Sequence, residues 1–156
     1  MTEFLYNIEG LINKCEADII YNVEGTKKDL ESDLVEDNDS SHLKRWLQQI
    51  AADMFVVLHK KGNGIEDSYQ WDTTVEGEEG KFIIYTIQIP TDLDPNLVAV
   101  IDTCIETAII TNLTNRWMKK RGQFDPVMED EAKSTITRVR NLINYKTSIK
   151  KTYDWY

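Results

Sequence analysis

The chain has 156 residues, 41% hydrophobic and 29% charged, which is the size and balance of a single globular domain. Asp and Glu number 27 against 18 Lys and Arg, a net charge of −9. This charge argues against general nucleic-acid binding and against docking on an anionic membrane, because both need a basic surface. We expect no signal peptide and no membrane span, because the N-terminal residues lack the required regions and no apolar run is long enough.

The residues that carry most enzyme chemistry are sparse. Cys15 and Cys104 both fall on apolar stripes, so we expect buried structural thiols in a reducing interior rather than a disulfide or a catalytic nucleophile. Together with His42 and His59 they are the whole supply of nitrogen and sulfur ligands, without the short spacing of a zinc site. No nucleophile elbow, P-loop or calcium loop occurs. We therefore expect no enzymatic activity, no metal and no cofactor.

Residues 2–22 carry apolar side chains three and four positions apart, which predicts one helix. Its stripe is Phe4, Ile8, Leu11, Ile12, Cys15 and Ile19. Thr2 is the predicted N-cap and Gly25 the predicted stop. Residues 23–40 hold seven acidic side chains against two lysines, so we expect a solvated connection there, with at most a short helical turn.

Three more helices follow from the same spacing. Residues 41–60 form the second, with Ser40 or Ser41 as its cap. Segments 94–121 and 126–145 each begin with Asp-Pro, a cap followed by proline at the first helical position. The helix over 94–121 is apolar over much of its surface, so we expect it at the centre of the fold. The short link between the last two helices predicts antiparallel packing.

Between the second and third helices the apolar period changes to two. Residues 69–89 read as two strands around a Gly-Glu-Glu-Gly turn, which predicts a β-hairpin. A lone hairpin is barely stable in water, so one face should lie on the helices while the other meets a partner. The side chains assigned to that hairpin interface are Tyr69, Trp71, Phe82 and Tyr85.

Residues 146–156 fit no helical stripe and reverse the charge balance of the chain, with three lysines against one aspartate. They end in the aromatic residues Tyr153, Trp155 and Tyr156, which are of the kind that anchors interfaces. The segment either folds back on its own domain or docks on another protein. The predicted architecture is therefore mainly α: residues 1–145 form a four-helix bundle with an inserted hairpin, and 146–156 form an extended C-terminal tail.

This layout resembles the head-to-tail connector (adaptor) proteins of tailed bacteriophages over residues 41–156. Three stretches carry the resemblance: the long segment from Asp94 to its Arg116-Trp117 pair, the Arg-bearing segment Glu131 to Asn144, and the basic segment Lys146 to Tyr153. The acidic connection over 23–40 has no counterpart in the family.

The resemblance implies a structural virion protein at the phage neck, made in the bacterial cytoplasm. Such adaptors form a homo-oligomeric ring, commonly of about twelve copies, whose subunits meet through two different faces. The ring joins the portal protein to the tail or to a second neck protein, and DNA passes through it without specific binding. The contacts with the portal or a neighbour would be Lys150, Lys151, Tyr153, Trp155 and Tyr156. A negative lumen would let DNA slide.

Two other classes fit the sequence. The first is a small acidic regulatory or inhibitory protein that binds a basic partner through its acidic runs, 24–39 and 66–79. The second is an enzyme with an unmarked carboxylate site, which would show clustered acids with perturbed pKa values in a cleft.

Overall fold

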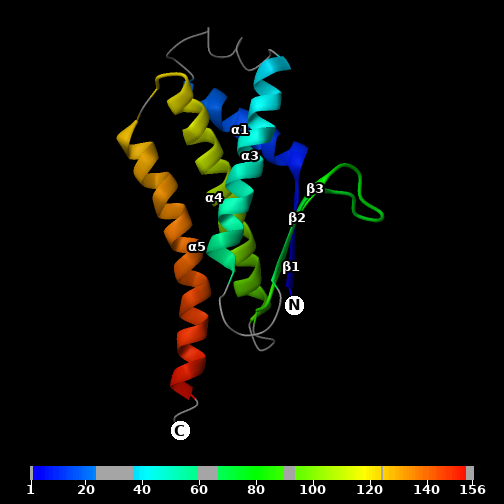
Figure 1. The fold of residues 1–156 in the computed structure, drawn as a ribbon. Helices are drawn as coiled ribbons and strands as arrows, with labels where there is room; N and C mark the ends of the chain where they lie inside the picture. Colours follow the sequence, from blue (N-terminus) through cyan, green and yellow to red (C-terminus); the bar gives the residue numbers. More distant parts are fainter. Residues whose placement is uncertain (1, 24–36, 60–66, 90–93, 124, 154–156) are drawn as a thin grey trace.

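The computed structural model describes residues 2–23, 37–59, 67–89, 94–123 and 125–153, with the backbone alone for 22–23, 37–41 and 144–153. The described part is mostly helical, with four helices and one small antiparallel sheet. In chain order the elements are β1 (Thr2–Asn7), α1 (Ile8–Val23), α3 (Asp37–Leu58), β2 (Ser68–Thr73), β3 (Phe82–Ile87), α4 (Pro95–Lys120) and α5 (Pro126–Tyr153). Figure 1 shows the helices gathered on one side, with the β2–β3 hairpin projecting from the other.

The first segment corrects the sequence prediction, because residues 2–7 form strand β1 rather than the start of a helix. Phe4 and Tyr6 are buried while Leu5 between them is exposed, which is the period of two of a strand. The cap of α1 is Asn7, not Thr2, since the Asn7 side-chain oxygen accepts a hydrogen bond from the Gly10 amide at 2.8 Å. The predicted stop at Gly25 lies outside the described residues.

The predicted hairpin is confirmed, and β1 completes it as a third strand. β3 is central, in the order β1-β3-β2, and both neighbours run antiparallel to it. Its side chains Ile83, Tyr85 and Ile87 enter the core cluster on the helix side. On the opposite face Phe82 and Ile84 are flanked by cross-strand neighbours from β1 and β2. This explains why β3 is apolar on both faces.

The helix predicted over 41–60 begins earlier, at Asp37, so Ser40 and Ser41 lie inside α3 and do not cap it. The predicted connection over 23–40 therefore has its last four residues in a helix, and 24–36 lie outside the described residues. Both Asp-Pro starts are confirmed. Asp94 accepts from the Asn96 amide and Asp125 from the Val127 amide, each at 2.9 Å.

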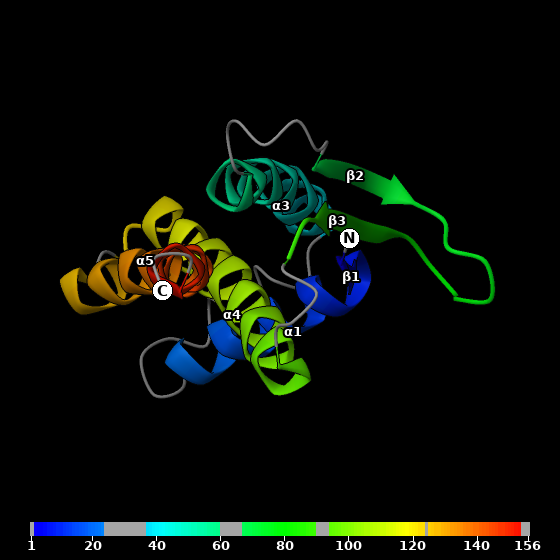
Figure 2. The ribbon, with the colours of Figure 1, turned by 90° about the horizontal axis from the view of Figure 1, so that it is seen from below.

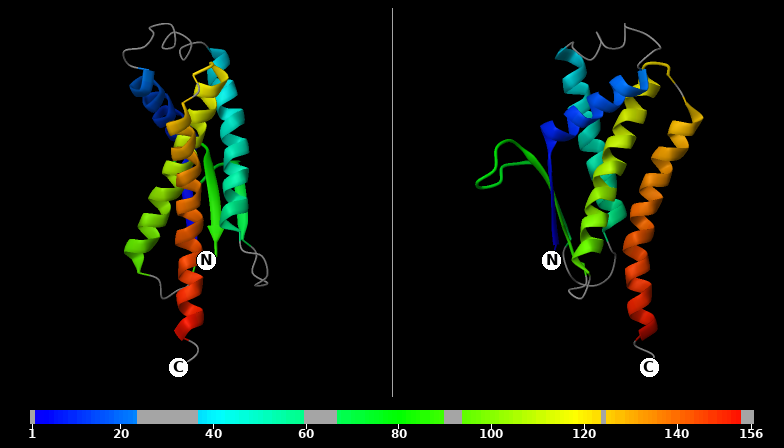
Figure 3. Two further views of the ribbon diagram at one scale, coloured as in Figure 1. Left: turned by 90° about the vertical axis from the view of Figure 1, so that its left-hand side faces the viewer. Right: turned by 180° about the vertical axis from the view of Figure 1, so that it is seen from behind.

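The C-terminal boundary is also different from the prediction. α5 continues to Tyr153, so residues 146–153 have a helical backbone rather than an extended one. The sequence offers a physical reason, because neither glycine nor proline occurs after Pro126 to end the helix. Both views in Figure 3 show α5 running past the lower ends of the other helices.

α4 is central, as predicted, and packs against α1, α3 and α5. It is the one helix among the described residues that is long and apolar enough to cross a membrane by length and composition alone. A core helix passes the same test, and the apolar residues of α4 include Ile105, Ala108, Ile109 and Leu113, all fully buried. Its composition therefore follows from packing on several sides at once.

Candidate interaction surfaces

The aromatic side chains of the hairpin are largely taken up by the protein itself. Tyr85 is fully buried and donates its hydroxyl hydrogen to the Ala51 carbonyl oxygen of α3 at 2.7 Å. Tyr69 stacks between Tyr85 and Phe55, at ring-centroid distances of 5.5 and 5.8 Å. Trp71 is half-buried and packs on the core. The prediction that Tyr85 belongs to an interface is therefore wrong, and Tyr69 and Trp71 make their main contacts internally.

Phe82, the fourth predicted interface residue, lies on the sheet face away from the helices. It is 8% exposed, and its backbone pairs with Asn7 of β1 and Thr73 of β2. Phe82 therefore stiffens the base of the hairpin and offers little surface to a partner. A contact with another molecule remains a prediction for Tyr69, Trp71 and Phe82.

The surface that the hairpin does expose is its tip, residues 74–81. Glu76, Glu78 and Glu79 are exposed there, together with Lys81. The end of the tip that adjoins β3 is anchored to the junction of β1 and α1. The Asn7 side-chain amide donates to the Glu79 carbonyl oxygen at 3.2 Å, and the Ile8 amide donates to the Lys81 carbonyl oxygen at 2.9 Å. These bonds hold the acidic tip in one direction, away from the helices (Figure 1).

Of the predicted C-terminal contacts, Lys150, Lys151 and Tyr153 lie on the helical backbone at the end of α5. Trp155 and Tyr156 lie outside the described residues. Their role in binding a partner stays a prediction.

The Arg116-Trp117 pair, on which part of the resemblance rests, has structural partners. The Arg116 guanidinium lies 5.5 Å from the ring centroid of Trp46 in α3. Trp117 is 2% exposed and belongs to the core, and the Arg121 guanidinium lies 5.3 Å from its ring centroid. Contacts of this kind are cation–π interactions. Arg116 therefore joins α4 to α3, while Trp117 packs in the core and against Arg121.

A second polar cluster closes the α4–α5 turn around Glu129. Its carboxylate accepts a hydrogen bond from the Asn115 side chain at 2.7 Å and lies 2.6 Å from the Lys119 ammonium and 3.7 Å from that of Lys133. The hydrogen bonds from Lys119 and Asn115 lower the pKa of Glu129 below its ordinary value. The cluster ties the first turn of α5 to the last turns of α4.

This cluster makes stability depend on pH. Since the pKa of Glu129 is lower in the folded protein, its carboxylate stabilises the fold above the ordinary glutamate pKa and loses that effect as the pH falls through the folded value. We expect Glu129→Gln to lower the urea midpoint of unfolding at neutral pH. At a pH below the folded pKa the variant and the native protein should coincide. Glu131→Gln, an exposed neighbour, is the control, and an equal loss there would contradict a specific role for Glu129.

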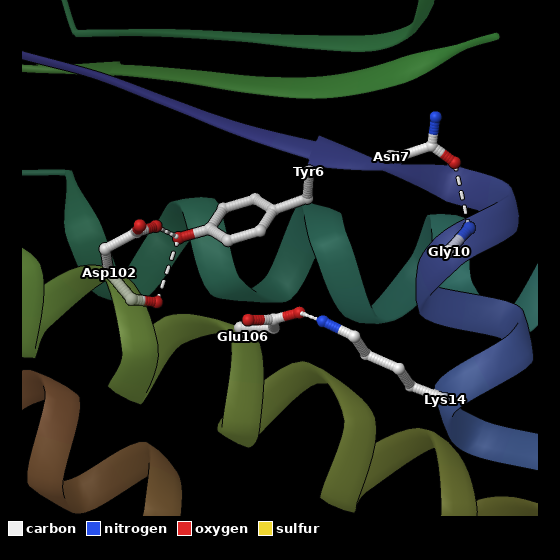
Figure 4. A network of polar contacts seen from close by, with 6 residues as sticks. All are labelled: Tyr6, Asn7, Gly10, Lys14, Asp102 and Glu106. Atoms are coloured by element: carbon white, nitrogen blue, oxygen red, sulfur yellow. Dashed lines mark hydrogen bonds and ion pairs between the residues drawn. The ribbon is translucent and has the colours of Figure 1, made fainter. Parts of the chain in front are cut away.

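A third network anchors the N-terminal segment on α4 (Figure 4). The Tyr6 hydroxyl donates to the Asp102 carboxylate at 2.6 Å, and the Lys14 ammonium pairs with the Glu106 carboxylate. Burial and the nearby Asp102 carboxylate raise the pKa of Tyr6 well above its ordinary value. The hydroxyl therefore stays protonated and keeps donating. Asp102 and Glu106 are thus turned toward β1 and α1.

A groove of about 360 Å³ lies between α4 and α5. Its walls are Ala99, Val100, Thr103, Cys104, Thr107, Thr135 and Arg138. Its described lining includes one guanidinium and one thiol but no histidine or carboxylate. Among the residues that the structure places, no group of three or more His, Cys, Asp or Glu side chains could hold a metal ion.

The two cysteines are free and buried, as predicted. Burial raises the pKa of Cys15 to about 12, the direction opposite to that of an activated nucleophile. His42 lies beside the Trp46 ring, and His59 Nδ1 lies 3.4 Å from the Asp67 carboxylate.

No protein-family model, curated protein or solved structure matches this chain. The fold thus defines a class in physical terms alone: a mostly helical protein with a three-stranded antiparallel sheet, from which an acidic hairpin tip projects.

Proposed function

We propose that this chain is a structural assembly protein, a head-to-tail connector subunit of a tailed bacteriophage. In this proposal the four helices act as one bundle with two projections, the hairpin tip and the C-terminal end of α5. Copies form a ring between the portal protein and the tail or a second neck protein, and DNA passes through it. The protein works in the virion and has no enzymatic activity.

The observation that carries the proposal is the anchored, exposed hairpin tip. Residues 74–81 add little to the core, yet backbone and side-chain hydrogen bonds fix their direction. A monomer gains no packing from such an arm, whereas a subunit of a heterologous ring needs a projection that reaches its neighbour. The layout of the long and closing helices, which resembles that of connectors, supports the same proposal.

In the proposal the C-terminal end of α5 contacts the portal. We expect the triple substitution Tyr153→Ala, Trp155→Ala and Tyr156→Ala to abolish binding to portal rings, because buried aromatic side chains supply much of the energy of an interface. The measurement is co-sedimentation with portal particles, and circular dichroism checks the fold.

The matched control is Tyr21→Ala, an exposed tyrosine on α1, which should leave binding unchanged. Undiminished co-sedimentation of the triple variant, with a native dichroism spectrum, would remove the C-terminal end from the proposed interface.

A further inference from the structure

The α4–α5 groove is open because the residues that line it are small. Ala99, Thr103 and Thr107 stand four positions apart on α4, and Thr135 faces them from α5. Val100 is 39% exposed and Cys104 lies at the wall. The surface is therefore partly apolar and recessed, and no side chain that the structure describes fills it.

Arg138 gives this groove its charge. It lines the groove and also an adjacent depression with Ser134, Thr137, Asn141 and Leu142. The side chain is exposed, and no ion pair joins it to an acidic group of the described chain. Asp102 and Glu106, the acidic side chains of α4 nearest in sequence to the groove residues, are bound to Tyr6 and Lys14 instead (Figure 4).

The sequence of α5 strengthens that charge. From residue 132 to residue 153 it has six basic residues and no acidic one, so all 27 acidic residues of the chain lie elsewhere. One positive helix segment is thus set in a strongly negative protein. Charge complementarity favours a negative partner for it, and a second copy of this chain provides one.

The exposed tip of the hairpin carries the opposite charge. Glu76, Glu78 and Glu79 form no ion pair with any described residue. In Figure 2 the hairpin points away from the α4–α5 pair, which lies on the opposite side of the molecule. One copy therefore cannot place its own tip in its own groove, and two complementary surfaces on opposite sides produce a head-to-tail contact.

We infer that the acidic hairpin tip of one copy docks in the α4–α5 groove of the next, with Arg138 between the carboxylates of Glu76, Glu78 and Glu79. The contact would repeat from copy to copy and would close into a ring or extend as a chain. The inference rests on the proposed function only for closure into a ring, since the contact itself needs two copies alone.

Sedimentation velocity at low ionic strength, over a series of protein concentrations, tests this contact. We expect the native protein to associate, and added salt to weaken that association. Reversal of the tip charges (Glu76→Lys, Glu78→Lys, Glu79→Lys) and the single change Arg138→Glu should each weaken it about tenfold or more. The two sets of changes combined should regain part of the loss. The control is a triple variant that makes the same change in net charge away from the tip and the groove: Glu9→Lys, Asp53→Lys and Glu131→Lys. Its association should be weakened less than that of the tip variant.

Chemical cross-linking fixes the geometry. Glu78→Cys places a thiol at the tip in one variant, and Thr107→Cys places one at the exposed wall of the groove in another. When the two variants are mixed, a short bismaleimide should join one copy to the other, since the native Cys15 and Cys104 are buried. Any one of three results would overturn the inference. The native protein could be monomeric at every concentration, the Arg138→Glu variant could associate as the native protein does, or a cross-link could form between two tips. Assembly on portal rings without the tip-to-groove cross-link would contradict this contact while leaving the proposed function standing.

Discussion

Replacement of Trp117 by alanine is expected to lower the free energy of unfolding by about 3–5 kcal/mol, the usual cost of removing a large buried aromatic side chain. Trp117 is 2% exposed and is among the largest side chains in the core. The substitution would leave a cavity in a helix that packs on three others, and it would remove the ring beneath Arg121. Native domains are stable by about 5–15 kcal/mol, so the variant should be near the limit of folding.

Urea denaturation followed by circular dichroism measures this loss. Val127→Ala is the control, because Val127 is 73% exposed and a surface change of this kind usually stays within about 0.5 kcal/mol. An equal, small change in both variants would show that the helices do not pack around Trp117 as described.

The second large loss in the free energy of unfolding is expected at Tyr85. The sequence predicts this side chain at an interface, whereas the structure places it in the core. Tyr85→Ala should cost about 3–5 kcal/mol, because the ring stacks on Tyr69 and is fully buried. Tyr85→Phe keeps the ring and loses only the hydrogen bond to the Ala51 carbonyl oxygen. That carbonyl lies within α3 and keeps its helical partner, so the loss should be about 1 kcal/mol.

The same unfolding experiment shows whether Tyr85 is a core residue or a residue that contacts a partner. A core residue gives a large loss for alanine and a small one for phenylalanine. A residue held for a partner would give little change in the stability of the isolated protein with either substitution, and that result would contradict the buried position.

The sequence predicts the elements whose signals are local. Asp94 and Asp125 cap helices within their own first turn, and the hairpin is defined by strands that adjoin its turn. β1 is not predicted from the sequence because its partner is remote: Phe4 pairs with Tyr85 across the sheet. Over six residues a period of two and a period of 3.6 are hard to distinguish, so only the pairing with β3 decides between strand and helix.

The interaction surfaces were harder to predict than the elements, because exposure is a property of the tertiary fold. Nothing near Trp71 or Tyr85 in the sequence shows that both contact the core, and nothing near Arg116 shows that Trp46 lies beneath it. The reversed charge of the last helix is visible in the sequence alone. The groove beside Arg138 is not, because small side chains on α4 and α5 form it only when the two helices pack together.

The most direct test of the proposed connector function is the sequence of the DNA that flanks this reading frame in its source. The proposal predicts terminase, portal and capsid genes nearby, with tail genes close behind. Flanking metabolic or defence genes would contradict it, and the acidic hairpin tip would then have to serve a basic partner of another kind.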